Sequence, residues 1–351
     1  MNRRSLMVLA LSAAWAFALA GARTSLAAGE AGKENETFTD PDKAGIDYRL
    51  QGEYEGTAGS EKWGAQVIAM GGGKFHAVFL PGGLPGAGWD PRTRYESQGQ
   101  LDGNKVTFTP TNKVAWEEGH FAPKVEIKSG FDGALEGNTL TGKTGDGRSF
   151  TLKKTVRHSP TEGAKPPQGA VVLFDGTNVD AWTGTRLLPG GLMKQGGQTK
   201  QKFTDYTLHI EFYLPFKPYA RSQERGNSGV YNQQLYETQV LDSFGVKGMD
   251  NQCGGLYTKA APLVNMCYPP LTWQTYDIDF TAARYEGGKK ASDAVITVRH
   301  NGVLVHDHFK LDGVTPGGGQ EDPKKPVQSG PIFLQDHGNP VAYRNVWIVG
   351  K

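Results

Sequence analysis

The sequence predicts an all-β protein in two parts, a small β-barrel or sandwich followed by a larger β-sandwich. Glycine accounts for 48 of the 351 residues and aromatic residues for 10%, a composition typical of short strands joined by tight turns. Short segments of alternating apolar and polar residues recur at intervals of about 8–12 residues. No window shows the sustained 3.6-residue apolar period of an amphipathic helix.

Residues 1–28 have the pattern of an export signal. Arg3 and Arg4 form a basic start, an apolar run covers 6–20, and small residues precede Ala28, where we expect cleavage. An uncleaved anchor is the alternative, although the run is short for a membrane span. We find no later apolar run of that kind, and we expect a secreted or periplasmic protein without a stable membrane span after cleavage.

The first folded part is expected at 45–157. Segments with strand-like alternation are separated by turn residues such as Gly71-Gly72-Gly73. The expected strands are 48–54, 63–70, 74–80, 94–101, 105–110, 124–129, 134–141 and 149–154.

Residues 158–169 contain three prolines and no large apolar side chain, so they are the best candidate for a linker. The second folded part is expected at 170–351, a length that suits a single sandwich. Its expected strands are 206–214, 229–231, 235–241, 276–280, 294–300, 303–309, 332–335 and 343–349.

Charge and motifs exclude several functions. The net charge is +2, from 38 basic and 36 acidic residues, without the basic block that a nucleic-acid partner requires. Residues 137–144 match the phosphate-binding loop pattern letter for letter, but a strand and a turn follow where a helix is needed. His306 and His308 share a strand face, which we interpret as solvated. Ser228 lacks the context of a hydrolase nucleophile.

The segment 236–242 is a candidate for chemistry. A period of two places Glu237 and Gln239 on one strand face, and a local bulge would bring Asp242 to the same side. Paired carboxyl groups serve as acid and base in glycoside cleavage; a polar sheet face without chemistry is the alternative. Further along, His337 is either a general base or acid or a turn cap beside Gly338-Asn339.

The chain has two cysteines, Cys253 and Cys267. In an exported protein such a pair can oxidise, and we expect a disulfide between them. Two separate buried thiols are the alternative.

Ordered motifs in the second part resemble the 3-keto-disaccharide hydrolase domain family over about 170–351. They begin with Leu173-Phe174-Asp175-Gly176-Thr177 and continue with 225–231, 236–243, 253–257, 273–277, 301–305, 334–339 and 344–348. The resemblance implies a concanavalin-like jelly-roll, which agrees with the predicted sandwich, and it supports the paired cysteines. It covers about half of the chain and leaves the first part without a catalytic role.

The resemblance also implies an enzyme that cleaves 3-keto-glycosides, with a carbohydrate as its partner. A ketone at C3 acidifies the C2 proton, so a base can remove it and the C1 oxygen then leaves. Glu237 or His337 would be the base, Arg225 or a bound cation would stabilise the enolate, and Asp242 would act as acid. Direct hydrolysis by paired carboxyls is the alternative mechanism.

The implied substrate-binding residues are Arg225, Asn227, Gln239, Tyr257, Lys259, Gln335 and Trp273. No cofactor is certain; a divalent cation is compatible, with Glu237, Asp242 and His337 as candidate ligands. The rival function is a non-catalytic carbohydrate-binding jelly-roll module of the cell envelope, in which aromatic platforms such as Trp273 and Trp89 would matter more than Glu237.

Overall fold

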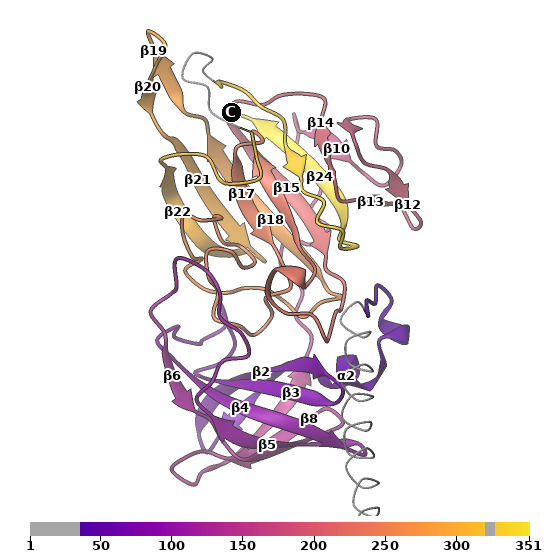
Figure 1. Ribbon diagram of the computed structural model, residues 1–351, viewed down its shortest axis with the longest axis vertical. Helices are drawn as coiled ribbons and strands as arrows, with labels where there is room; N and C mark the ends of the chain where they lie inside the picture. Colours follow the sequence, from indigo (N-terminus) through magenta and orange to yellow (C-terminus); the bar gives the residue numbers. More distant parts are fainter. Residues whose placement is uncertain (1–35, 320–326) are drawn as a thin grey trace, which may run out of the picture.

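The computed structural model describes residues 36–319 and 327–351. Two β-rich units follow one another along the long axis of the molecule, with the indigo-to-magenta unit at one end and the orange-to-yellow unit at the other (Figure 1). The expected export segment, 1–28, lies outside the described residues. Within the described residues, no helix combines the length and the apolar character that a membrane crossing needs.

The first unit is a closed antiparallel barrel with one added strand. Its strands are β1(Gly52–Ala58), β2(Glu61–Gly71), β3(Lys74–Pro81), β4(Thr93–Asp102), β5(Lys105–Thr111), β6(Glu126–Ser129), β7(Gly133–Glu136), β8(Thr139–Lys143) and β9(Ser149–Thr155). The order is β3-β2-β1-β9-β8-β7-β5-β4-β6, and the pairing of β3 with β4 closes the ring. The strand β6 pairs in parallel with β4 at the edge.

Alternation along the strands fills the barrel. Phe150 and Leu152 of β9 are buried inside, whereas their neighbours Ser149 and Thr151 are exposed. The predicted strand 134–141 is in fact two strands, because Gly137 adopts a φ of 56° in the turn between β7 and β8. The phosphate-loop-like sequence is therefore a hairpin, as its context indicated.

The chain enters the barrel through a helix rather than a strand. The helix α2(Gly45–Leu50) occupies the beginning of the predicted strand 48–54. Gln51 closes it by donating its backbone N–H to the Asp47 carbonyl at 3.0 Å. Gly52 has a φ of 146°, a conformation that L-residues avoid, and it redirects the chain into β1. This turn is the reason why the strand starts later than predicted.

The second unit is a two-layer sandwich. One sheet has the order β12-β13-β24-β15-β18-β21-β22, with β10 also on β24, and the other has the order β11-β14-β23-β16-β17. The strands are β10(Val171–Phe174), β11(Trp182–Thr183), β12(Leu187–Leu188), β13(Leu192–Lys194), β14(Gly197–Thr199), β15(Tyr206–Tyr213), β16(Ser228–Asn232), β17(Tyr236–Val240), β18(Trp273–Thr281), β21(Ala294–His300), β22(Val303–Leu311), β23(Phe333–Leu334) and β24(Ala342–Gly350). The short 3-10 helices η1(Pro41–Lys43) and η2(Ser222–Glu224), and the hairpin of β19(Arg284–Glu286) with β20(Lys289–Ser292), complete the described elements.

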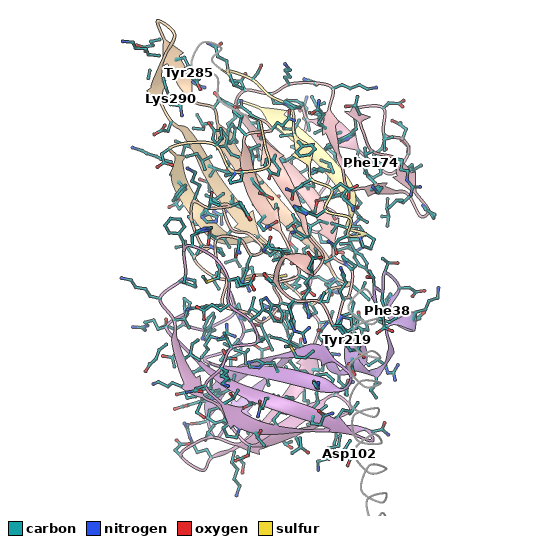
Figure 2. All side chains as sticks on the ribbon, in the orientation of Figure 1. Phe38, Asp102, Phe174, Tyr219, Tyr285 and Lys290 are labelled. Atoms are coloured by element: carbon teal, nitrogen blue, oxygen red, sulfur yellow. The ribbon has the colours of Figure 1, made fainter. Side chains whose placement is uncertain are left out.

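Five of the residues labelled in Figure 2 mark the ends and the junction of the molecule. Asp102 lies at the far end of the barrel, and Tyr285 and Lys290 lie on the hairpin at the opposite end (Figure 2). Phe38 and Tyr219 lie where the two units meet (Figure 2). There the backbones of Phe38 and Phe216 exchange two hydrogen bonds of 2.9 Å.

The predicted linker, 158–169, packs along the outer face of the larger sheet, and we call this segment the strap. Ser159 Oγ lies 2.6 Å from Thr275 Oγ1, and the Gly163 N–H donates to Glu211 Oε1 at 2.6 Å. The Trp347 indole N–H donates to the Ala164 carbonyl at 3.2 Å. The segment therefore connects the units while being fixed to one of them.

The barrel strand β2 is buried on both faces and belongs to two cores. Ala65, Val67 and Ala69 pack inside the barrel, whereas Ile68 packs with the sandwich core. The face that Ile68 shares with Gln66 is thus buried as well, unlike the outer face of a half-exposed strand. The neighbouring strand β3 divides in the same way between the two cores, so apolar core residues lie on both sides of the seam between the units.

Candidate active site

The two strands β16 and β17 carry a polar face on the outside of the smaller sheet. In their antiparallel register, Tyr231 lies opposite Glu237 and Gly229 lies opposite Gln239. The alternate side chains of the same strands pack in the sandwich core: Val230, Tyr236 and Val240. The structure thus shows the two-residue alternation expected for Glu237 and Gln239.

Glu237 is the central ionisable group of this face. Its side chain is 2% exposed, and its Oε2 accepts a hydrogen bond of 2.8 Å from the Tyr231 hydroxyl. Its Oε1 lies over Gly229, where a Cβ atom would come within 2.1 Å of it. Burial raises the pKa of Glu237 to about 8, against the lowering effect of the Tyr231 hydrogen bond. At neutral pH the protonated form of this carboxyl group therefore predominates.

Further donors and acceptors surround Glu237. Gln335 Nε2 donates to the Tyr231 hydroxyl oxygen at 3.3 Å, and Gln335 Oε1 is buried without a partner. Tyr257 is half-buried beside the strand, with its backbone N–H on the Glu237 carbonyl at 3.3 Å. Burial, followed by the charges of Glu237 and Asp250, raises the pKa of Tyr257. The hydroxyl groups of Tyr231 and Tyr257 therefore both keep their protons near neutral pH.

A connected row of amide side chains extends the face. Gln239 Nε2 and Asn227 Nδ2 both donate to Gln223 Oε1 at 3.2 Å, and Gln223 Nε2 donates to the Asn251 carbonyl at 2.8 Å. The oxygens Asn227 Oδ1 and Asn251 Oδ1, like Asp250 Oδ2, are buried without a hydrogen-bond donor. Buried acceptors without donors are costly. Sugar hydroxyl groups are donors that would satisfy them.

Arg225 and Asp242 lie apart from this face, in the seam with the barrel. Arg225 Nε donates to Asp242 Oδ2 at 2.6 Å, and neither side chain has exposed surface. The guanidinium group also lies 5.0 Å from the centre of the Trp116 ring, which comes from the barrel unit. Burial raises the pKa of Asp242, although Arg225 opposes the rise. The pair therefore has no open side for a substrate.

His337 lies on an exposed turn. The hydrogen bond that shapes this turn comes from Asp336, whose Oδ1 accepts the Gly338 N–H at 2.8 Å. Asn339, the last residue of the turn, accepts a hydrogen bond of 2.8 Å from Lys217 Nζ. Asp336, rather than His337, therefore caps this turn.

Two other candidate binding residues are engaged elsewhere. Lys259 forms an ion pair with Asp312 at 2.9 Å. Trp273 lies in the other sheet, at the start of β18, where the Arg344 guanidinium stacks 3.9 Å from its ring centre. The structure therefore brings together Glu237, Gln239, Asn227, Tyr257 and Gln335, but leaves Arg225, Asp242, Lys259 and Trp273 in other surroundings.

The predicted disulfide is wrong for this structure. Cys253 and Cys267 are buried free thiols. Cys253 Sγ lies 3.2 Å from the Tyr276 hydroxyl oxygen, and Cys267 Sγ lies 3.5 Å from the Leu241 carbonyl oxygen. The two thiols also form a side-chain hydrogen bond with each other, so they are free thiols but not the separate ones of the alternative.

The candidate ligands Glu237, Asp242 and His337 do not gather around one point. Among the described residues, no three His, Cys, Asp or Glu side chains form a group suited to a metal ion. Sequence reasoning missed Tyr231 and Asp250. Tyr231 lies opposite Glu237 across the hairpin, and this pairing is the signal that could have found it. Asp250 lies in a loop, where no periodicity applies.

Comparison with known proteins defines the class and then the family. The second unit is a carbohydrate-processing domain on a β-sandwich. Residues 169–349 match the family described as the 3-keto-α-glucoside-1,2-lyase-like domain, and the chain belongs to this family. A search of curated proteins finds no match.

Solved structures from Parabacteroides distasonis ATCC 8503, each described as a candidate glycosyl hydrolase, resemble the chain. One is 35% identical with a TM-score of 0.48, covering 53% of this chain and 85% of its own. A second is 17% identical with a TM-score of 0.38, covering 56% and 98%. A third is 19% identical with a TM-score of 0.37, covering 52% and 99%.

Proposed function

We propose that the protein cleaves 3-keto-glycosides, with Glu237 as the residue that transfers the C2 proton. The main support is the buried Glu237 carboxyl group, hydrogen-bonded to Tyr231, on a face with unsatisfied acceptors. Its pKa of about 8 lies close to neutral pH, where a proton-transfer group is most effective. Membership of a 3-keto-α-glucoside-1,2-lyase-like family supports the substrate class.

The chemistry begins at the C2 proton. The carboxylate form of Glu237 takes that proton, and the electrons of the C2–H bond move to the C3 oxygen as an enolate. Tyr231 Oη and Gln335 Nε2, which lie 3.3 Å apart, are the neighbouring donors for the enolate oxygen. The electrons then return to expel the C1 oxygen and form a C1–C2 double bond, while an acid protonates the leaving oxygen. Addition of water across the double bond completes a net hydrolysis.

The test is turnover of 3-keto-sucrose by Glu237→Gln, which keeps the shape of the side chain but removes its basicity. We expect kcat to fall by about 10²–10⁴-fold, the usual contribution of a general base. Glu286→Gln, on the exposed hairpin strand β19, is the matched control and should keep full activity.

Three outcomes would contradict the proposal or its mechanism. Full turnover by Glu237→Gln removes the assigned role. Cleavage of unoxidised sucrose by the wild type favours direct hydrolysis by carboxyl groups. Binding of the 3-keto-sugar without turnover by the wild type favours the carbohydrate-binding module.

We propose further that the protein works outside the cytoplasm. The support is the basic start and the apolar run within residues 1–28. Cell fractionation followed by N-terminal sequencing tests this proposal. A mature chain beginning at or near Ala28 is the expected result, and an intact Met1 in the cytoplasmic fraction contradicts it.

A further inference from the structure

A long loop of the barrel unit crosses the seam onto the sandwich. Residues 112–125 join β5 to β6. Glu117 forms an ion pair of 2.5 Å with Lys247, and Glu118 accepts a hydrogen bond from the Ser222 hydroxyl. Long loops held in place in compact domains are disproportionately functional. This loop brings residues of the barrel unit to the sandwich unit.

The loop places His120 against the buried carboxyl group of Asp250. Asp250 Oδ1 accepts the backbone N–H groups of His120 at 2.7 Å and Phe121 at 2.9 Å. Asp250 Oδ2 lies 3.4 Å from His120 Nδ1; the Asp250 side chain has no exposed surface, whereas that of His120 is 73% exposed. Nδ1 is thus the ring nitrogen on the Asp250 side, and Nε2 is left for another partner. Such a pair can transfer protons.

Asp250 belongs to the same polar face as Glu237. The segment after Asp250 runs along β17, where the Gly254 N–H donates to the Gln239 carbonyl at 3.0 Å and the Gln239 N–H donates to the Gly255 carbonyl at 2.9 Å. Tyr257 experiences the charges of both Glu237 and Asp250. The backbone hydrogen bonds of His120 and Phe121 to Asp250 thus anchor the loop next to the segment that borders β17.

We propose that His120, held by Asp250, is the acid that protonates the leaving glycosidic oxygen, so that the barrel unit completes the active site. This inference rests on the proposed function. As the C1–O bond breaks, the imidazolium Nε2–H bond breaks as well and its proton passes to the leaving oxygen, while Glu237 holds the proton taken from C2. In the hydration step, the neutral imidazole takes a proton from the water whose hydroxide adds to C1, and Glu237 returns its proton to C2, so that both groups regain their starting forms.

The charged groups around His120 are consistent with this function. Asp250 faces the ring from the sandwich unit, and Glu117 and Glu118 lie on its own loop, each engaged with a partner in the sandwich. Tyr257 is a further titratable group that experiences the charge of Asp250. Among these groups, Asp250 is the carboxyl group that directly faces the imidazole ring.

The alternative is a purely structural latch, in which the backbone N–H groups hold Asp250 and the imidazole does nothing. His120→Gln distinguishes the two because it retains both backbone hydrogen bonds and removes only the proton donor. The experiment compares kcat of the full chain on two substrates, 3-keto-trehalose and 4-nitrophenyl 3-keto-α-glucoside. The second releases nitrophenolate, which leaves without an acid.

We expect His120→Gln to lose about 10²-fold or more in kcat on 3-keto-trehalose and almost nothing on the nitrophenyl substrate, with an unchanged melting temperature. His308→Gln is the matched control, since His308 is 82% exposed and lies 2.5 Å from Asp307; it should keep full activity on both. Equal losses on both substrates, or no loss on either, would overturn the inference. A wild type inactive on both substrates would refute the proposed function, and the inference with it.

Discussion

At the scale of single residues, the site depends on the pair of Glu237 and Tyr231. A two-residue period identified Glu237 from the sequence, because a strand fixes which side chains share a face. The same reasoning could not show that Asp242 turns into the seam, since its position depends on Arg225 and on the barrel behind it. Residues after the end of a strand escape periodicity.

Tyr231→Phe tests this pair. The hydrogen bond from Tyr231 lowers the pKa of Glu237, so its loss should raise that pKa further. The carboxylate form then becomes scarcer at neutral pH, and the rising limb of kcat against pH should move to higher pH. A pH–rate profile on 3-keto-sucrose checks the shift; an unmoved limb would show that the bond does not tune Glu237.

At the scale of elements, the sequence predicted most of the long strands and missed the short ones. The strands β4, β9 and β21 begin and end within one residue of their predicted bounds. The two- and three-residue strands β11 to β14 are too short to show a period, and their pairing comes from tertiary contacts. The composition of 158–169 likewise predicted a linker. It could not predict that side chains of the larger sheet, such as Thr275 and Glu211, bind this segment.

The strap depends on Glu211 of β15. Burial alone would raise its pKa, but hydrogen bonds from His209, Asn345, Arg344 and Gly163 hold it down, to about 2. A carboxyl group with a lowered pKa in the folded state stabilises the fold above its ordinary value of 4.5, and the stability is lost as the pH falls towards about 2.

Glu211→Gln should therefore lower the free energy of unfolding at pH 7 and flatten its decline between about pH 4.5 and 2. Urea denaturation across that range measures both effects. Glu136→Gln, at an exposed end of β7, is the control and should follow the wild-type curve. If the free energy of unfolding of Glu211→Gln fell with decreasing pH as steeply as that of the wild type, Glu211 would not be the source of this acid dependence.

At the scale of the whole molecule, the seam makes the two units one cooperative structure. Ile68 and Trp116 of the barrel unit pack in the sandwich core, and Phe216 and Leu271 of the sandwich unit pack in the barrel core. Arg94 of the barrel also donates to the Gly245 carbonyl at 2.6 Å. Shared burial of this kind couples the unfolding of both parts.

Asp242→Ala would leave the Arg225 guanidinium buried without its carboxylate. Removing one partner of a buried ion pair costs about 3–5 kcal/mol, so we expect a lower melting temperature with the single transition preserved. Differential scanning calorimetry measures both. Separate transitions for the barrel and the sandwich in the wild type would contradict the cooperative seam.

The double burial of β2 has a consequence for where the molecule can be divided. A protease that cuts within 158–169 severs the chain at its most obvious boundary, yet β2 still contributes side chains to both cores. We expect the two fragments to co-elute in gel filtration and to separate only in denaturant. On this expectation the fragments stay associated without the covalent connection. The linker at 158–169 divides the sequence, but it does not divide the packed cores, because β2 belongs to both of them.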